Sequence, residues 1–224
     1  KISLATLLLL KSSPLKKGVI LFMVLRTIIF VLIWVFVLQF KLMKNSNQES
    51  EASAAFWERE RKANFTRKKP LPVDDYIKIP LEQLPFSTVD DPQEQEIQQQ
   101  ITSLSKEPIL NVSDMTNTDI KLTYGSGNFQ LIARYDQNFQ QLQQLLKKWA
   151  ILLYEHGKKA DAKTVLEYSI YLGCDISKSY TLLADIYQEE QDYISIQDLI
   201  DVVQNLHTLM KDSILRQLKE RLPK

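Results

Sequence analysis

Few residues in this chain combine the types and spacings that catalysis or metal binding requires. The sequence has two histidines, His156 and His207, and neither has a cysteine, aspartate or glutamate at the spacing of a recognised metal site. Glu189 and Glu190 are adjacent on a predicted helix, so their carboxylates do not face one another. The chain also lacks a phosphate-binding loop, a nucleophile elbow and a zinc-finger spacing. We therefore expect no catalytic, metal-binding or cofactor-binding residues, and no enzyme activity.

The remaining reactive groups have structural explanations. Cys174 is the only cysteine, which excludes an intramolecular disulfide, and its apolar neighbours predict a small, half-buried residue at a helix end. His156 precedes Gly157 at the end of another predicted helix, where a cation interacts favourably with the last carbonyl groups. The net charge of +1 provides no broad positive field for nucleic acid. We therefore expect a partner that is another protein or peptide, with no nucleic acid and no small-molecule substrate.

Residues 18–40 form an apolar run that is long enough to cross a membrane. A helix of this length covers roughly 34 Å at 1.5 Å per residue, and the hydrocarbon core of a bilayer is about 30 Å thick. Arg26 lies inside the run, and we expect its side chain to extend toward the N-terminal interface beside Lys16 and Lys17. The alternatives are a buried core helix and a signal peptide, whose apolar region would be shorter and closely followed by small residues. Because the nearest such cluster is at residues 52–55, we predict an uncleaved anchor.

The charges that flank this span favour a cytoplasmic N-terminus. Lysines in the basic flank at residues 1–17, reinforced by Arg26, outnumber the basic residues that closely follow the span. A basic cluster farther along argues for the opposite orientation; it consists of Arg59, Arg61, Lys62, Arg67, Lys68 and Lys69. We predict a single-pass cell-membrane protein with an extracytoplasmic C-terminal domain. The start at Lys1 suggests a fragment or a processed chain.

Residues 41–112 are predicted to connect the anchor to a folded domain. Residues 41–55 are small and polar, as in a juxtamembrane spacer, and residues 54–69 predict a short charged helix. The basic cluster in this helix, together with Phe56 and Trp57, has two interpretations. It is either a solvated face or a contact with anionic lipid headgroups, near which each basic residue contributes about 1 kcal/mol.

Six of the eight prolines fall within residues 70–108, and proline fixes φ and removes a hydrogen-bond donor. This part is therefore predicted as a Pro-rich extended linker. Residues 75–86 are too apolar for a disordered chain, so we expect them to lie along a surface of the folded domain. Asp91 followed by Pro92 and Glu94 predicts the start of a helix, with an N-cap carboxylate and a proline at the first helical position.

Two similar helical segments follow at an offset of 34 residues. Residues 144–176 align with residues 178–210 at apolar and small positions, and the aligned pairs are Leu146 with Tyr180, Trp149 with Leu183, Ala150 with Ala184, Leu153 with Tyr187, Ala162 with Ile196, Leu166 with Ile200 and Leu172 with Leu206. A shared period of this length is typical of stacked helical hairpins. At these positions the chain resembles the tetratricopeptide repeat (TPR) family, with small residues where paired helices approach closely and Gly157 at the turn between helices.

Together with the predicted transmembrane helix at residues 18–40, the resemblance indicates an all-α fold whose C-terminal domain occupies residues 113–224. TPR-like hairpins are expected at about residues 143–176 and 177–210. Helices around residues 129–135 and 211–221 are expected to cap the two ends. The chain, including the run at residues 56–61, is also similar to uncharacterised single-pass membrane-anchored TPR-like proteins of Gram-positive anaerobic bacteria.

The TPR resemblance also implies a concave groove formed by the first helix of each hairpin. Its lining is expected to be Lys147, Ile151, Tyr154, Glu155, Lys178, Thr181, Asp185, Gln188 and Glu189. Such a mixed polar surface suits an extended peptide or a partner helix, unless residues 75–86 fill it as an internal plug. We therefore expect a membrane-anchored interaction scaffold or assembly factor for another envelope or membrane protein. The alternative is a membrane-surface tether or regulator that binds anionic lipid through the basic juxtamembrane segment.

Overall fold

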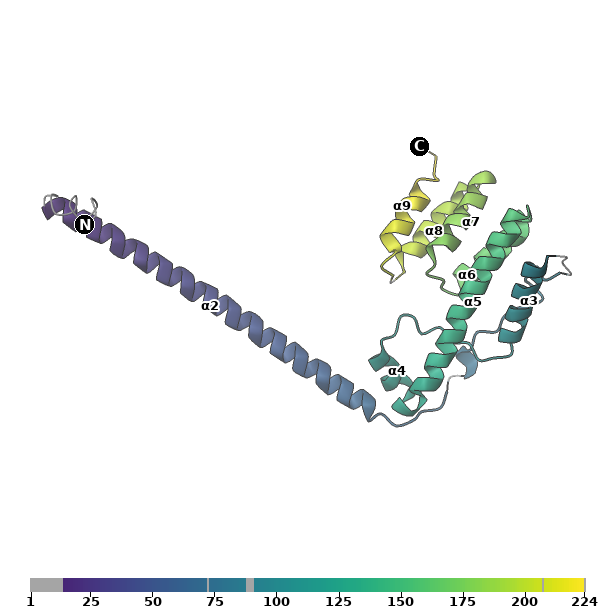
Figure 1. Ribbon diagram of the computed structural model, residues 1–224, viewed down its shortest axis with the longest axis horizontal. Helices are drawn as coiled ribbons and strands as arrows, with labels where there is room; N and C mark the ends of the chain where they lie inside the picture. Colours follow the sequence, from purple (N-terminus) through teal and green to yellow (C-terminus); the bar gives the residue numbers. More distant parts are fainter. Residues whose placement is uncertain (1–13, 72, 88–90, 207, 224) are drawn as a thin grey trace, which may run out of the picture. The chain divides into compact units, whose positions relative to one another are not determined.

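The computed structural model describes residues 14–71, 73–87, 91–206 and 208–223, and every regular element among them is a helix (Figure 1). The all-α prediction is therefore confirmed for this part of the chain. The chain divides into two compact units, which meet in sequence between Arg61 and Lys62. We call the second unit the helical domain.

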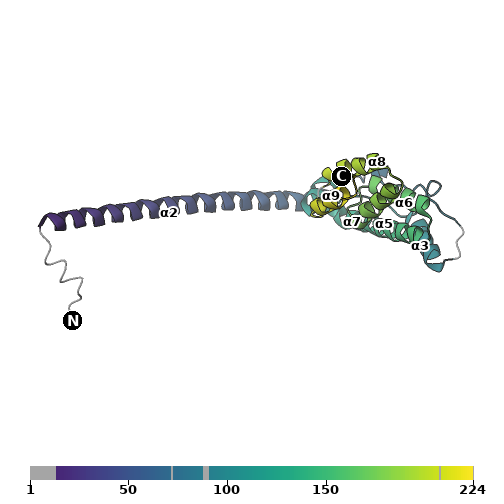
Figure 2. The same cartoon turned by 90° about the horizontal axis from the view of Figure 1, so that it is seen from above.

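Helix α2 (Pro14–Asn64) is one uninterrupted element of 51 residues (Figure 2). Its segment Phe22–Gln39 has a mean hydropathy of 2.4, and none of its residues is buried. Among the described residues, this is the one helix that is long and apolar enough to cross a membrane. The predicted anchor thus has the expected length and composition.

The predicted spacer over residues 41–55 is helical and continuous with the apolar segment. The reason is that no glycine or proline occurs between Gly18 and Pro70, so no residue interrupts the backbone hydrogen bonds of a helix. The Asn and Ser residues of this stretch each cost at most about 0.7 kcal/mol of helix propensity. The charged helix predicted at residues 54–69 forms the last part of the same element as far as Asn64, and residues 65–69 are not helical.

The Pro-rich segment belongs to the core of the helical domain and is not a free linker. After a short 3₁₀ turn, η1 (Val73–Asp75), the backbone N–H of Ile77 donates to the carbonyl of Ile109 at 2.9 Å. Ile79 and Leu84 are buried in the main apolar core. Phe86 packs on Trp149 with 4.9 Å between ring centroids. Tertiary contacts therefore hold residues 76–87, where Pro80 and Pro85 prevent a continuous helix.

Local capping signals set the next helices. Helix α3 (Pro92–Leu104) begins where predicted, and the Asp91 carboxylate accepts the N–H of Gln93 at 3.0 Å. Helix α4 (Asn117–Tyr124) begins with a capping box between Thr116 and Asp119 and ends at Gly125, followed by the turn η2 (Ser126–Asn128). Gly125 has φ = 88°, and a Cβ there would lie 2.3 Å from the carbonyl oxygen of Arg67. Only glycine fits this close approach.

The remaining helices form two consecutive hairpins and a terminal helix. Helix α5 (Phe129–Glu155) pairs with α6 (Lys159–Tyr171), and α7 (Ser177–Glu189) pairs with α8 (Tyr193–Gln204). Helix α9 (Lys211–Lys219) packs on both α7 and α8, in the place predicted for a cap. The N-terminal cap predicted around residues 129–135 is not a separate helix, because no breaker separates it from the rest of α5.

Small residues allow the paired helices to approach closely. Ala150, Ala162 and Ala184 are fully buried, as are the large side chains of Trp149 and Tyr180. The Tyr180 hydroxyl donates to the carbonyl of Cys174 at 2.6 Å, which satisfies its polar atom inside the core. In Figures 1 and 2, α3, α5, α6 and α7 lie side by side in the helical domain. This arrangement positions the surface described next.

Candidate functional site

The C-terminal ends of α5 and α7 are joined by a polar cluster that includes two of the predicted groove residues. The Tyr154 hydroxyl donates to one carboxylate oxygen of Glu189 at 2.7 Å, and Lys159 Nζ donates to the other at 2.6 Å. The hydrogen bond to Glu189 raises the pKa of Tyr154. Conversely, the hydrogen bonds from Lys159 and Tyr154 lower the pKa of Glu189. The cluster fixes the spacing of the two helices.

Other predicted groove residues are occupied within the domain. Asp185 accepts a hydrogen bond from Arg221 Nε at 2.6 Å, so the segment after α9 covers this part of α7. Thr181 is buried and donates its hydroxyl to the carbonyl of Lys178. Lys147 donates to Gln144 on its own helix at 2.5 Å. These three predicted groove residues therefore make their polar contacts within the domain.

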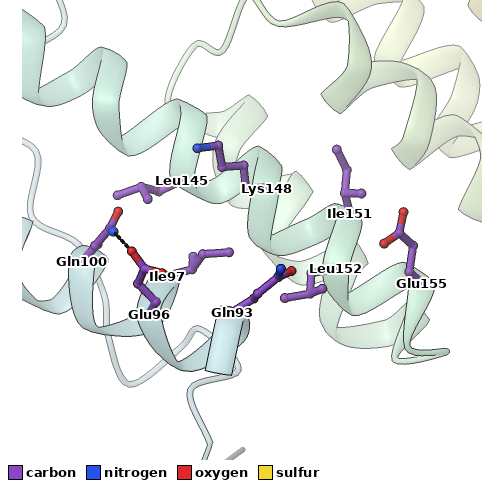
Figure 3. A pocket seen from close by; sticks show the side chains of 9 residues that line it. All are labelled: Gln93, Glu96, Ile97, Gln100, Leu145, Lys148, Ile151, Leu152 and Glu155. Carbon is purple, nitrogen blue, oxygen red and sulfur yellow. Dashed lines mark hydrogen bonds between the residues drawn. The ribbon is translucent and has the colours of Figure 1, made fainter. Parts of the chain in front are cut away.

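Ile151 and Glu155, which are also predicted groove residues, line an open cavity of about 400 Å³ between α3 and α5 (Figure 3). We call it the α3–α5 groove. The other predicted residues do not line it, and Lys178 and Gln188 are exposed on α7. Its full lining is Gln93, Glu96, Ile97, Gln100, Leu145, Lys148, Ile151, Leu152 and Glu155.

The floor of the α3–α5 groove is apolar and its rim is charged. Ile97 of α3 lies opposite Leu145 and Leu152 of α5 (Figure 3). Lys148 and Glu155 lie on either side of Ile151 along α5, and neither makes a hydrogen bond or ion pair with a described residue. The groove therefore offers an apolar contact flanked by one lysine and two carboxylates, and the carboxylate of Glu96 accepts a hydrogen bond from Gln100 at 2.9 Å. None of its lining residues comes from the segment 75–86, which borders a different face of α3.

A buried carboxylate attaches α3 to α5. Glu94 is 1% exposed and accepts hydrogen bonds from Trp149 Nε1 at 3.3 Å and Lys158 Nζ at 3.0 Å. Next to it, His156 Nε2 lies 3.8 Å from a carboxylate oxygen of Asp91. A buried charge without partners is costly, so these donors keep the N-terminal end of α3 in place. The wall of the groove is therefore held at one end by specific polar contacts.

Sequence analysis did not identify the α3 residues that line the groove. Gln93, Glu96, Ile97 and Gln100 lie about 50 residues before the part of α5 that they face. The available signal was Glu94, an acidic residue on the same helix as two apolar isoleucines, but its partner Trp149 lies 55 residues away. Local patterns do not identify a pairing over that distance.

The groups able to do chemistry are few among the described residues. No cluster of three or more His, Cys, Asp or Glu side chains is found there that could hold a metal ion. Cys174 is fully buried, and its burial raises the pKa of the thiol. A thiol with a raised pKa forms little nucleophilic thiolate at neutral pH. His207 lies outside the described residues.

The residues predicted to contact lipid are divided between the two units. Phe56 and Trp57 are exposed and pack edge-to-face on each other with centroids 5.4 Å apart, and Arg61 pairs with Glu58. Arg59 is exposed on the same helix. Lys62, Arg67 and Lys68 are exposed in the helical domain, where Lys69 donates to the carbonyl of Leu122 at 2.6 Å.

The continuous helix places these aromatic residues far from the predicted span. Phe56 lies 16 residues beyond Phe40 on α2, which is about 24 Å at 1.5 Å per residue. Surface charges are screened within about 8 Å at physiological ionic strength. The lipid-contact interpretation requires Phe56 and Trp57 to lie close to the membrane, whereas the continuous helix over residues 41–55 holds them away from the end of the predicted span.

Comparisons of the chain with protein-family models, with curated proteins and with solved structures gave no match.

Proposed function

We propose that this protein is a membrane-anchored interaction scaffold or assembly factor, without catalytic activity, that holds another membrane or envelope protein through the α3–α5 groove. The observation that carries the proposal is an open apolar floor between two charged side chains, Lys148 and Glu155, that have no described partner. Surfaces of this kind suit an amphipathic helix or an extended peptide. The apolar segment Phe22–Gln39 of α2 would anchor the chain as a single-pass membrane protein with a cytoplasmic N-terminus.

The interpretation of the two hairpins as TPR-like repeats is part of this proposal. It is supported by two consecutive hairpins whose aligned positions, such as Ala150 and Ala184, are both fully buried. The groove differs from the one that the resemblance implies, because α3 provides its second wall. A suitable partner therefore presents an apolar side chain to Ile97 and Ile151, an acid to Lys148 and a base to Glu155.

The test is site-specific photo-crosslinking of the full chain in membranes of its own cells. A photoreactive residue replaces Gln100 on the groove rim, and the adducts are compared between the parent chain and the double variant Lys148→Glu, Glu155→Lys. Both positions are exposed, so the swap should preserve the fold, which circular dichroism and thermal unfolding check. We expect a discrete adduct that the charge swap removes.

The matched control is Lys178→Glu, an exposed lysine on α7 outside the groove. The Lys178→Glu chain should form the same adduct as the parent chain, in the same yield. The same adduct in all three chains would show that the groove does not hold the partner.

A second candidate function is a membrane-surface tether that binds anionic lipid through the basic juxtamembrane segment. The exposed pair Phe56 and Trp57 is the observation in its favour. It requires α2 to break or lie along the bilayer after Phe40, because a straight continuation holds these rings about 24 Å away. This function would be favoured if the reconstituted chain binds anionic lipid in a salt-sensitive manner. The double variant Phe56→Ser, Trp57→Ser should then lose this binding.

A further inference from the structure

Arg26 is the one charged residue inside the apolar segment Phe22–Gln39 of α2. The neighbouring Thr27 donates its hydroxyl to the carbonyl of Val24 at 2.8 Å, so that polar group is satisfied within the helix. The Arg26 guanidinium carries five N–H donors and remains charged. Ionisable residues inside a membrane span are rare, and they commonly pair with one another or line a functional path. Arg26 is therefore the group of this span that needs an anionic partner.

Arg26 lies well inside any span that this sequence can form. A span needs about 20 residues, and Lys41 limits the apolar run on its C-terminal side, so the span reaches back to about residue 21. Arg26 is then at least five residues, or roughly 8 Å, from the N-terminal boundary. If the span starts at Gly18, the depth is about 12 Å. At either depth, an arginine stem of three methylene groups must be fully stretched before the guanidinium can approach the headgroups.

The chain itself provides no carboxylate at this depth. Residues 1–48 contain neither aspartate nor glutamate. The first acid, Glu49, lies 23 residues farther along the same helix, about 34 Å away at 1.5 Å per residue. A second copy of the chain has the same acid-free segment, so it would add a second arginine in place of a counter-ion. Residues 1–48, in this copy or in a second one, therefore cannot provide a carboxylate that meets Arg26 within the bilayer, and a different membrane protein can.

We propose that Arg26 is a docking point within the bilayer for a partner transmembrane helix that carries an aspartate or glutamate at the same depth. Charge complementarity argues for this occupant, since an arginine and a carboxylate form bidentate, charge-assisted hydrogen bonds. Water does not compete for these bonds in the hydrocarbon core. The inference rests on the proposed membrane insertion of α2 and is independent of the α3–α5 groove.

The test uses the full chain in phosphatidylcholine vesicles, with a donor dye on Ser46→Cys in a Cys174→Ser background. The probe is a synthetic leucine–alanine transmembrane peptide with an acceptor dye and with Glu, Gln or Leu at the depth of Arg26. We expect energy transfer to show about tenfold tighter association with the Glu peptide than with the Leu peptide. Arg26→Leu should remove this preference, and Arg26→Glu should transfer it to a peptide that carries Arg.

Lys44→Leu is the control, because it removes a positive charge outside the apolar segment and should leave the preference unchanged. Flotation after a carbonate wash reports insertion separately for every variant. Equal association with all three peptides by an inserted parent chain would overturn the inference and show that Arg26 reaches the headgroups, while membrane anchoring stands. A parent chain that does not insert would overturn both the anchor and the inference.

Discussion

The two units of this chain use the same kinds of apolar residue in opposite ways. In α2, Phe30 and Trp34 are 71% and 60% exposed, whereas Trp149 and Tyr180 of the helical domain are fully buried. The span of α2 is apolar on all sides, and such a helix requires an apolar surrounding. The helices of the domain instead bury an apolar stripe against one another. The domain carries its own apolar interior, while α2 depends on the medium around it.

Two tryptophans give the sharpest form of this comparison. Trp149→Ala removes a fully buried ring that contacts Phe86 and donates to Glu94. We expect it to lower the free energy of unfolding of the helical domain by about 3–5 kcal/mol. Trp57→Ala removes a ring that is 66% exposed on α2, and its effect should stay within about 0.5 kcal/mol.

Urea unfolding of the full chain in detergent, followed by fluorescence and circular dichroism, measures both values. Similar losses for the two variants would mean that α2 and the domain share one cooperative core, and the contrast between the units would fail.

Replacing an isoleucine by aspartate tests the same comparison with the roles of the two units exchanged, because here the change in α2 is expected to have the larger effect. Ile33→Asp places a charge near the middle of the apolar segment of α2 and should disfavour membrane insertion by about 2.5–3.5 kcal/mol. Ile194→Asp changes a residue of α8 that is 78% exposed, so insertion and domain stability should both be unaffected. A glycosylation or protease-protection assay of insertion reads out the first effect. Equal insertion of both variants would contradict the role of α2 as the anchor.

The buried carboxylate of Glu94 distinguishes a specific contact from surface charge. Lys158→Met leaves Glu94 with only neutral donors, and we expect a loss of about 2 kcal/mol in the free energy of unfolding. Lys163→Met breaks an ion pair with the exposed Glu190 and should cost at most about 1 kcal/mol. Thermal unfolding of both variants at neutral pH compares the two losses. If both variants unfold alike, α3 is not held through Glu94.

Sequence patterns predicted the local features of this molecule well. The Asp91–Pro92 start of α3 was predictable because its capping bond spans only two residues. The apolar length of α2 was equally visible. The breaks assumed at residues 41–55 and near residue 135 were wrong, because polar composition alone does not end a helix that lacks glycine and proline.

The candidate site was only partly predictable. Ile151 and Glu155 were identified from their place on α5, but the opposite wall of the groove comes from α3. That wall is set by contacts such as Glu94 to Trp149, which span 55 residues. Helical periodicity shows which face of a helix is buried, and it does not show which other helix covers it.

The smallest expected effect is the pH dependence of the cluster that joins α5 and α7. Hydrogen bonds from Lys159 and Tyr154 lower the pKa of Glu189 below its ordinary value of 4.5. The unfolded chain therefore binds this proton at higher pH than the folded chain does. The stabilisation is fully present above about pH 4.5 and is lost as the pH falls through the lowered pKa.

The Tyr154 hydroxyl sets the alkaline limit of the same contact. Its bond to Glu189 raises the pKa of Tyr154 above 10.0, so its contribution is present below pH 10.0 and is lost as the pH rises through the raised value. Glu189→Gln should flatten the acid side of the plot of unfolding free energy against pH, and Tyr154→Phe should flatten the alkaline side. Glu155→Gln, an exposed carboxylate without a described hydrogen bond, is the matched control and should leave both sides unchanged. Identical acid slopes for Glu189→Gln and the parent chain would show that this cluster does not couple α5 to α7.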